Sequence, residues 1–320
     1  MTNDFKVGTF NLFNLISPEK TYYGKRSYSH ETYQQKIAWI GSQLDRMGAD
    51  IVGFQEVFDE KALREALQKS DYMRSAKIVM VPCKGDTPSV AIASRFPILA
   101  YEVIEGFPAT MDMETKEFTR AILKVTIEVR PNLAITFLTA HLKSKRPMLD
   151  KEDRDITLLE RSEGEVKATI HRLAEALALR TIIVDELQNR RKPLILVGDL
   201  NDNDRAVSTR VISGEPPFRN MPDHVKRGIW DIILYHVKEI QSRKSYQDFY
   251  YTHIHNGHHE ALDHIMVSQE LVAENPESIG RVGYVRTFND HLIDETLSDE
   301  RVAEWQSDHA QVVACIELKG

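Results

Sequence analysis

The chain has little cysteine, no long apolar run and no excess of positive charge. Its two cysteines, Cys83 and Cys315, lie in apolar surroundings away from other metal-type ligands, which argues against a disulfide framework and against a structural zinc site. The net charge of −7 at pH 7 argues against a strongly basic surface of the kind that attracts polyanions at long range. Affinity for a nucleic acid would therefore need a local basic patch or a bound metal ion.

Targeting and linker segments are also missing from the sequence. No stretch approaches the uninterrupted apolar run of a membrane span, so we expect no membrane association. Residues 1–15 lack the basic region, apolar core and cleavage site of a secretory signal, which favours a cytoplasmic protein. No repeat or Gly/Ser/Pro-rich linker divides residues 1–320, so we predict a single domain, and nothing indicates an obligate protein partner.

Short segments rich in β-branched and aromatic residues occur along the whole chain. The predicted strands are Lys6–Leu12, Asp50–Val57, Ser89–Arg95, Ala121–Val129, Leu133–Leu142, Pro193–Leu200, Leu262–Ser268 and His309–Leu318. The tripeptide Arg130-Pro131-Asn132 between two of them predicts a hairpin turn.

Two further segments have the period of a helix. The first places its apolar residues on one stripe and ends at Gly48: Tyr33, Ile37, Ile40, Leu44 and Met47. The second and longer stripe consists of Val166, Ile170, Leu173, Leu177, Val184 and Leu187. Strands with antiparallel connections, interleaved with a few helices, predict an α/β layered sandwich.

Polar residues close two of the apolar strands near the start of the chain. Asn11 follows Thr9-Phe10, and Glu56 follows Phe54-Gln55. A carboxylate in such a place is costly to bury unless it is paired or bound to a cation, and Mg²⁺ prefers oxygen ligands. Taken alone, Glu56 is explained at least as well by an ordinary salt bridge or by contact with solvent.

The segment Gly198-Asp199-Leu200-Asn201 follows a strand of the buried type. In extended chain, residues two apart point to the same side, so Asp199 and Asn201 could face one ligand. The carboxylate would activate water or hold a metal ion, and the amide would donate to a phosphate oxygen. A turn in which these side chains bond their own backbone is an equally good explanation.

Two Asp–His dipeptides, Asp263-His264 and Asp308-His309, each lead into a strand. Histidine exchanges a proton near neutral pH, and a carboxylate on its other nitrogen fixes its tautomer and orientation. The two dipeptides supply the parts of one Asp–His dyad and one spare metal carboxylate. Taken singly, each could lie at a surface strand edge.

Two loops are rich in ionisable groups. The segment His141-Leu142-Lys143-Ser144-Lys145-Arg146 places an imidazole and three cations after a strand, which suits a phosphate, although a solvated loop explains Lys145 and Arg146 better. The His-rich segment 252–260 could hold a transition metal, but closely spaced histidines on a polar loop are more often solvated. Residues 289–304 form an acidic loop that could shape a pocket or cover it.

These segments, in this order, resemble the endonuclease/exonuclease/phosphatase superfamily. The segments that carry the resemblance are Asn11, Gln55-Glu56, Ser94-Arg95-Phe96-Pro97, His141-Leu142-Lys143, Gly198-Asp199-Leu200-Asn201, Leu262-Asp263-His264 and Ser307-Asp308-His309. The resemblance implies a four-layer αββα sandwich with two packed mixed β-sheets. It places the site at the sheet edge between the two halves.

The resemblance also implies roles for these residues. Glu56 would be the principal ligand of Mg²⁺ or Mn²⁺, with Asn11 and Asp308 near the ion. The residues expected to orient water and phosphate are Asp199, Asn201 and a His309 that is held by Asp263. Arg95 and Lys143 are the expected substrate contacts.

His141 resembles the second histidine of the deoxyribonuclease-like branch, and Asp86 is a candidate for its acidic partner. On this basis we predict a divalent-metal-dependent phosphodiesterase that cleaves nucleic acid, with DNA as the first expectation. One alternative is a phosphatase or phospholipase C-like hydrolase of an inositol phosphate, a small phosphoester or a sphingolipid head group. Another is an inactive binding module of the same fold.

Overall fold

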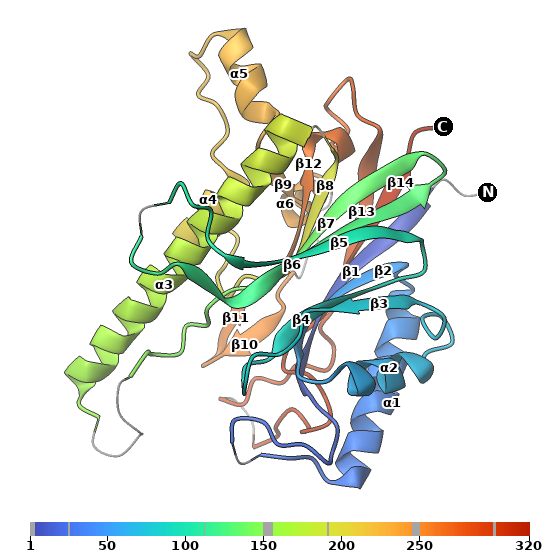
Figure 1. Ribbon diagram of the computed structural model, residues 1–320, viewed down its shortest axis with the longest axis vertical. Helices are drawn as coiled ribbons and strands as arrows, with labels where there is room; N and C mark the ends of the chain where they lie inside the picture. The colour runs from blue at the N-terminus through green and yellow to red at the C-terminus, as the bar shows by residue number, and fades with distance from the viewer. Residues whose placement is uncertain are drawn as a thin grey trace.

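Two six-stranded mixed β-sheets form the centre of the molecule (Figure 1). The computed structural model describes residues 4–24, 26–111, 113–149, 156–190, 192–244, 250–296 and 299–320. In spatial order, the first sheet contains β13 (Gly280–Phe288), β14 (Gln311–Leu318), β1 (Asp4–Leu15), β2 (Ile51–Val57), β4 (Ser89–Ser94) and β3 (Lys77–Met80). The second contains β5 (Ile98–Gly106), β6 (Glu117–Arg130), β7 (Leu133–His141), β8 (Leu194–Asp199), β12 (Asp263–Ser268) and β9 (Leu234–His236).

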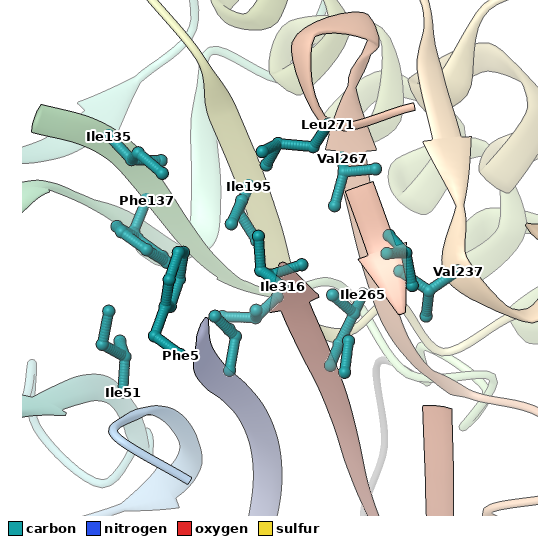
Figure 2. Packing of buried hydrophobic residues seen from close by; sticks show 14 of the residues in the cluster. Phe5, Ile51, Ile135, Phe137, Ile195, Val237, Ile265, Val267, Leu271 and Ile316 are labelled. Carbon is teal, nitrogen blue, oxygen red and sulfur yellow. The ribbon is translucent and has the colours of Figure 1, made fainter. Parts of the chain in front are cut away.

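The two sheets pack face to face through a shared apolar core. Figure 2 shows Phe5 and Ile51 of the first sheet near Phe137 and Ile195 of the second, and all four side chains are buried. β8 is buried on both faces, which explains why it is an apolar run rather than an alternating pattern. Every predicted strand is present, with its ends shifted by a few residues.

Helices cover the outer faces of both sheets and complete the four layers. A second apolar cluster joins the first sheet to α1 (His30–Met47) and α2 (Glu60–Gln68). A third joins the second sheet to α3 (Leu158–Asp185) and α4 (Val207–Ser213). The described chain also contains a short hairpin and two peripheral helices, namely β10 (His253–His255), β11 (His258–Glu260), α5 (Asp223–Trp230) and α6 (Val237–Ser242). The predicted αββα sandwich is therefore confirmed.

The two predicted helices are present, but only the first buries the predicted stripe. In α1, Ser29 accepts a hydrogen bond from the backbone of Thr32, and Gly48 ends the helix at φ 52°. In α3, the expected stripe is wrong, because Val166 and Ile170 are each 58% exposed. The buried face instead carries mostly small and polar residues, namely Ala168, Arg172, Ala174, Glu175, Ala176 and Ala178, together with the two large apolar residues Leu179 and Ile183. Alanine lets a helix approach a sheet closely. A helix face made of alanines is not recognised when only large apolar side chains are taken as the buried stripe.

Several strands have no counterpart among the predictions. β5 lies at the edge of its sheet and exposes much of its length, including the apolar side chains of Leu99 and Tyr101. The segment expected to be a solvated His-rich loop forms the β10–β11 hairpin around an Asn256-Gly257 turn, where both residues have positive φ. No helix in the described part of the chain is long and apolar enough to cross a bilayer.

Candidate active site

The candidate site lies where strand ends of the two sheets meet, and Asp199 is at its centre. In the first sheet, Asn11 donates its side-chain amide to Asp199 Oδ2 at 3.1 Å. His309, just before β14, places Nε2 4.0 Å from the same oxygen. From the second sheet, His141 Nε2 lies 3.5 Å from it. Each sheet thus contributes part of one polar cluster.

Strand register explains how β8 presents Asp199 to this cluster. β7 pairs with β8 so that His141 lies beside Asp199, and β12 pairs with β8 so that Asp263 lies opposite it. The parallel approach of β7 depends on Gly198, because a Cβ there would lie only 2.0 Å from the carbonyl oxygen of Ala140. A larger residue would force the two strands apart.

Asp263 and His309 form a hydrogen-bonded pair across the two sheets. Asp263 Oδ2 lies 2.8 Å from His309 Nδ1, and both residues are buried. Thr252 Oγ1 accepts from the backbone N–H of Asp263, and Ser307 Oγ accepts from that of His309. The Ser307 hydroxyl in turn donates to the backbone carbonyl oxygen of Asn11 at 2.7 Å. This network fixes the imidazole with Nε2 directed at Asp199.

Burial and neighbouring charges shift the ionisation of the central groups. Burial raises the pKa of Asp199 to about 7, although the positive charge of His309 opposes this shift. Burial alone would lower the pKa of His309, but the carboxylates of Asp263 and Asp199 outweigh it and raise that pKa well above the usual value. Burial lowers the pKa of His141 far below the usual value, and the charge of Arg120 adds to the effect. Near neutral pH the site therefore combines an imidazolium, a neutral imidazole and a carboxylate close to its titration midpoint.

Asn201 follows Asp199 in an Asx turn. From the sequence, this turn and a shared ligand were equally good explanations. Its backbone N–H donates to Asp199 Oδ1 at 2.8 Å, and its φ is 54°. Its side-chain amide donates to the Leu142 carbonyl at 3.0 Å, so Asn201 also fixes the loop that follows His141.

Glu56 lies at an irregular end of β2, close to the cluster. Pairing with β4 shifts register between Phe54 and Val57, and Glu56 itself has φ 59°. The carboxylate accepts from the backbone N–H of Asn14 at 3.1 Å. Such strain in a non-glycine residue is typical of a functional position.

The surroundings of Glu56 fit a divalent cation. Burial raises the pKa of Glu56, and the negative charge of Asp308 raises it further. Asp308 Oδ1 is buried and has no hydrogen-bond partner among the described residues. Two carboxylates that disfavour each other's charge, with the Asn11 side chain beside them, form an oxygen-rich set suited to a hard cation.

Two cations of this region were missed by the sequence predictions. Lys36 of α1 is 1% exposed, with Nζ over the rings of Phe13 and Tyr28 at 5.5 and 5.2 Å. Burial lowers the pKa of Lys36 to about 8, although the charges of Asp308 and Glu56 act in the opposite direction. A lysine three residues after Tyr33, on the apolar stripe of α1, was the signal available in the sequence.

Arg120 at the start of β6 is the second such cation. Its charge lowers the pKa of Glu56 and of His141, which places it near both. Its Nη1 donates to the Leu142 carbonyl at 3.4 Å, whereas Nε is buried without a partner in the described structure. A guanidinium with an unused donor suits a phosphate oxygen. The sequence offered little signal for it, because one arginine in a strand is unremarkable.

The loop after His141 is held by α3. Glu175 is fully buried and accepts from the backbone N–H of Lys143 at 2.6 Å, and Arg172 donates to the Lys143 carbonyl. The ammonium of Lys143 donates to the carbonyls of Ser144 and Arg146, each at 3.0 Å. Lys143 thus lies close to the site while stabilising its own loop.

The structure does not bring Arg95 to the other predicted residues. Arg95 forms an ion pair with Asp50 at 2.7 Å and stacks on the ring of Tyr72, 3.9 Å from its centroid. β4 runs antiparallel to β2, so the residue after β4 lies beside the start of β2, at the opposite end from Glu56. The prediction that Arg95 contacts substrate is therefore corrected.

Asp86 is likewise not the partner of His141. It lies on the exposed loop between β3 and β4, whereas His141 is buried. The carboxylate beside His141 belongs to Asp199. The sequence could not reveal this contact, because the two residues are joined by strand register rather than by proximity along the chain.

Comparison with solved structures shows the same fold in other proteins. Truncated TDP2 from Caenorhabditis elegans has a TM-score of 0.55 and 15% identity, covering 98% of this chain and 97% of its own. A Bacteroides thetaiotaomicron endonuclease/exonuclease/phosphatase family protein has a TM-score of 0.58 and 16% identity, with coverages of 98% and 94%. ANGEL2, described as a 2′,3′-cyclic phosphatase, has a TM-score of 0.58 and 14% identity, with coverages of 98% and 95%.

Sequence comparison identifies the family directly. No curated protein matches the chain. The profile of the Endonuclease/Exonuclease/phosphatase family, however, matches residues 8–309, which include the cluster from Asn11 to His309. Members of this family are phosphoester hydrolases that depend on a divalent metal ion. The chain therefore belongs to the endonuclease/exonuclease/phosphatase family and is a phosphoester hydrolase.

Proposed function

We propose that the protein is a Mg²⁺- or Mn²⁺-dependent phosphodiesterase that cleaves nucleic acid, with DNA as its first substrate. The observation that carries this proposal is the position of Asp199, whose carboxylate lies between the imidazoles of His141 and His309. With a pKa of about 7, Asp199 can accept a proton from an attacking water at physiological pH.

In this proposal the two histidines have different tasks. Asp263 keeps His309 oriented and protonated, so its Nε2–H can donate to a phosphate oxygen as negative charge develops there. His141 acts as a neutral imidazole, because its pKa is lowered. Arg120 supplies a further donor from its unused Nε.

Glu56, Asn11 and Asp308 are the residues that would hold the metal ion. When bound, such an ion polarises the phosphoester and stabilises the charge of the transition state. The irregular end of β2 positions the Glu56 side chain. The negative charges of Glu56 and Asp308 repel each other, and a bound cation would relieve this repulsion.

Two observations favour a diester over a monoester. A diester carries one negative charge, so it places less charge beside Asp199, Glu56 and Asp308 than a dianionic monoester does. ANGEL2, which shares the fold, is described as acting on a cyclic phosphate, which is itself a diester. Nucleic acid offers such diesters repeatedly along an extended chain.

A substrate panel tests this proposal. The purified protein with Mg²⁺ should cleave plasmid DNA, single-stranded DNA or RNA and an aryl phosphodiester, and should leave an aryl phosphomonoester almost unchanged. Asp199→Asn should abolish each activity, while Asp223→Asn on the exposed α5 should retain it, which excludes a contaminating nuclease. If every nucleic acid stays intact while an inositol phosphate or a phospholipid head group is hydrolysed, the nuclease proposal is wrong.

A further inference from the structure

The β10–β11 hairpin brings one of its histidines next to His309. The hairpin lies beside the start of β14, because Ala310 donates its backbone N–H to the Thr252 carbonyl at 2.8 Å. His253 is half-buried, whereas His255 and His258 are exposed. The rings of His253 and His309 lie 4.8 Å apart and are inclined by 32°. The hairpin therefore adds one imidazole to the edge of the site.

Both imidazoles have the arrangement found in metal-binding histidines. His309 Nδ1 is held by the Asp263 carboxylate at 2.8 Å, and His253 Nδ1 by the Asp308 carbonyl at 3.0 Å. In metal sites the non-ligating nitrogen of a histidine is commonly fixed by a carboxylate or a backbone carbonyl in this way. Each ring is then left with Nε2 as the nitrogen that can bind a metal ion, once His309 has lost its proton there.

Asp308 supplies a third ligand at the same place. Its Oδ1 is buried without a hydrogen-bond partner in the described part of the chain. One ligand atom from each of His253, Asp308 and His309 lies within 4.8 Å of the other two. Atoms bound to one ion at about 2.0–2.2 Å in tetrahedral geometry lie about 3.3–3.6 Å apart, so side-chain movements of about 1 Å complete the set.

A cavity next to these side chains leaves room for a further ligand. It has a volume of about 470 Å³, and its lining includes His253, Asp308, Asn256, Leu292 and Asp294. Three protein ligands beside an open space are typical of a metal ion that keeps a water molecule in its fourth position.

We propose that His253, Asp308 and His309 form a second metal site, which takes a transition-metal ion such as Zn²⁺. Two imidazole nitrogens and one carboxylate favour Zn²⁺ over Mg²⁺, which needs oxygen ligands. The site is distinct from that of Glu56, although Asp308 could bridge the two. A consequence that rests on the proposed function is slower phosphodiester hydrolysis with Zn²⁺ bound, because the ion displaces the proton from Nε2 of His309 into solvent and removes that donor.

Calorimetric titration of Zn²⁺ into the full chain tests the site without any substrate. The protein is first stripped with a chelator and then saturated with Mg²⁺. We expect one Zn²⁺ ion per chain, and His253→Ala should weaken binding on the order of tenfold or more. His258→Ala is the matched control, because this exposed histidine belongs to the same hairpin and should leave the affinity unchanged. His253→Gln provides a second test if the alanine variant does not fold, as judged by circular dichroism.

The Glu56→Gln variant separates this proposal from the proposed function. It should lose Mg²⁺ affinity and keep its Zn²⁺ affinity, and this result would stand even if the protein cleaved no nucleic acid. The second site is refuted if Zn²⁺ binds equally well to the wild type and to both His253 variants. It is also refuted if His258→Ala weakens binding as much as His253→Ala, or if Glu56→Gln abolishes Zn²⁺ binding.

Discussion

At the scale of single residues, the charge state of Asp199 depends on its neighbours. A buried carboxylate is normally neutral, whereas one that faces an imidazolium is stabilised as an anion. The two effects leave the pKa of Asp199 at about 7, while Asp263 holds the positive charge on His309. A proton acceptor and a charged donor can therefore coexist a few ångströms apart.

The Asp263–His309 pair should act as one unit in turnover. His309→Ala should reduce kcat on an aryl phosphodiester by about 100-fold or more, the usual contribution of a positioned acid–base group. Asp263→Asn should cost nearly as much, because it removes the carboxylate that orients and charges the imidazole. The double variant should be little worse than either single one. Strictly additive losses would mean that the two residues act independently.

The pKa of Asp199 also predicts how stability depends on pH in the metal-free protein. A carboxyl whose folded pKa is raised from 3.8 to about 7 binds more protons in the folded state, so stability is lost as pH rises through this interval. Asp199→Asn removes that loss. Melting temperatures should therefore favour the variant at about pH 8 and show no such advantage at about pH 4. Parallel curves for wild type and variant across this range would contradict the assignment.

At the scale of the elements, the close approach of β7 and β8 positions the site. Gly198 makes it possible, since a side chain there would meet the backbone of Ala140. This contact also places His141 beside Asp199, so a change in strand spacing alters the chemistry as well as the packing.

Gly198→Ala should therefore impair both stability and turnover. Because the added Cβ would lie 2.0 Å from the Ala140 carbonyl oxygen, the strands must part. The free energy of unfolding should fall by about 1–3 kcal/mol, the usual effect of overpacking. Gly228→Ala on exposed α5 is the control, since its Cβ meets nothing within 4 Å and should stabilise the helix by up to about 1 kcal/mol. Equal effects of the two variants in denaturant titrations would rule out the close approach as the cause.

Much of the site could be predicted from the sequence because its residues follow apolar strands. Asp199 and Glu56 each interrupt a run of apolar residues that is typical of a buried strand. The direction of neighbouring strands is not readable in this way, so the sequence could not show that Arg95 lies at the opposite end of its sheet from Glu56. Lys36 was missed although its place on the apolar stripe of α1 was a signal. Arg120 was missed because nothing local distinguishes a partly buried arginine in a strand from one in solvent.

At the scale of the whole molecule, the site exists only where the two sheets meet. Asn11, Glu56 and His309 come from the first sheet or its edge, and His141, Asp199 and Asp263 come from the second. Packing of the shared core therefore determines the distances within the site. With a net charge of −7, recognition of a polyanion such as the proposed nucleic acid would depend on local groups near this edge.

The loop that follows His141 should contribute to the binding of long substrates. Lys145 forms an ion pair with Glu260, and Lys143 bonds its own loop, so both are held near the site rather than free in solvent. Replacing Lys143 and Lys145 with methionine removes both charges. The KM for DNA should then rise more than the KM for a small aryl diester, because only the polymer extends beyond the reacting phosphate. Lys84→Met, which removes an exposed cation paired with Glu105, is the control. An equal rise in KM for both substrates would show that the loop acts only through the site itself.

Metal dependence tests the central claim most directly. The initial rate of aryl phosphodiester hydrolysis should be measured after exhaustive dialysis against a chelator, and again after Mg²⁺ or Mn²⁺ is added. We expect no turnover in the stripped protein and full recovery with either ion. Glu56→Gln should need on the order of tenfold more Mg²⁺ or fail to recover, whereas Glu60→Gln on the exposed face of α2 should behave as wild type. Full activity in the stripped protein, or a Glu56→Gln variant with unchanged Mg²⁺ dependence, would contradict the account.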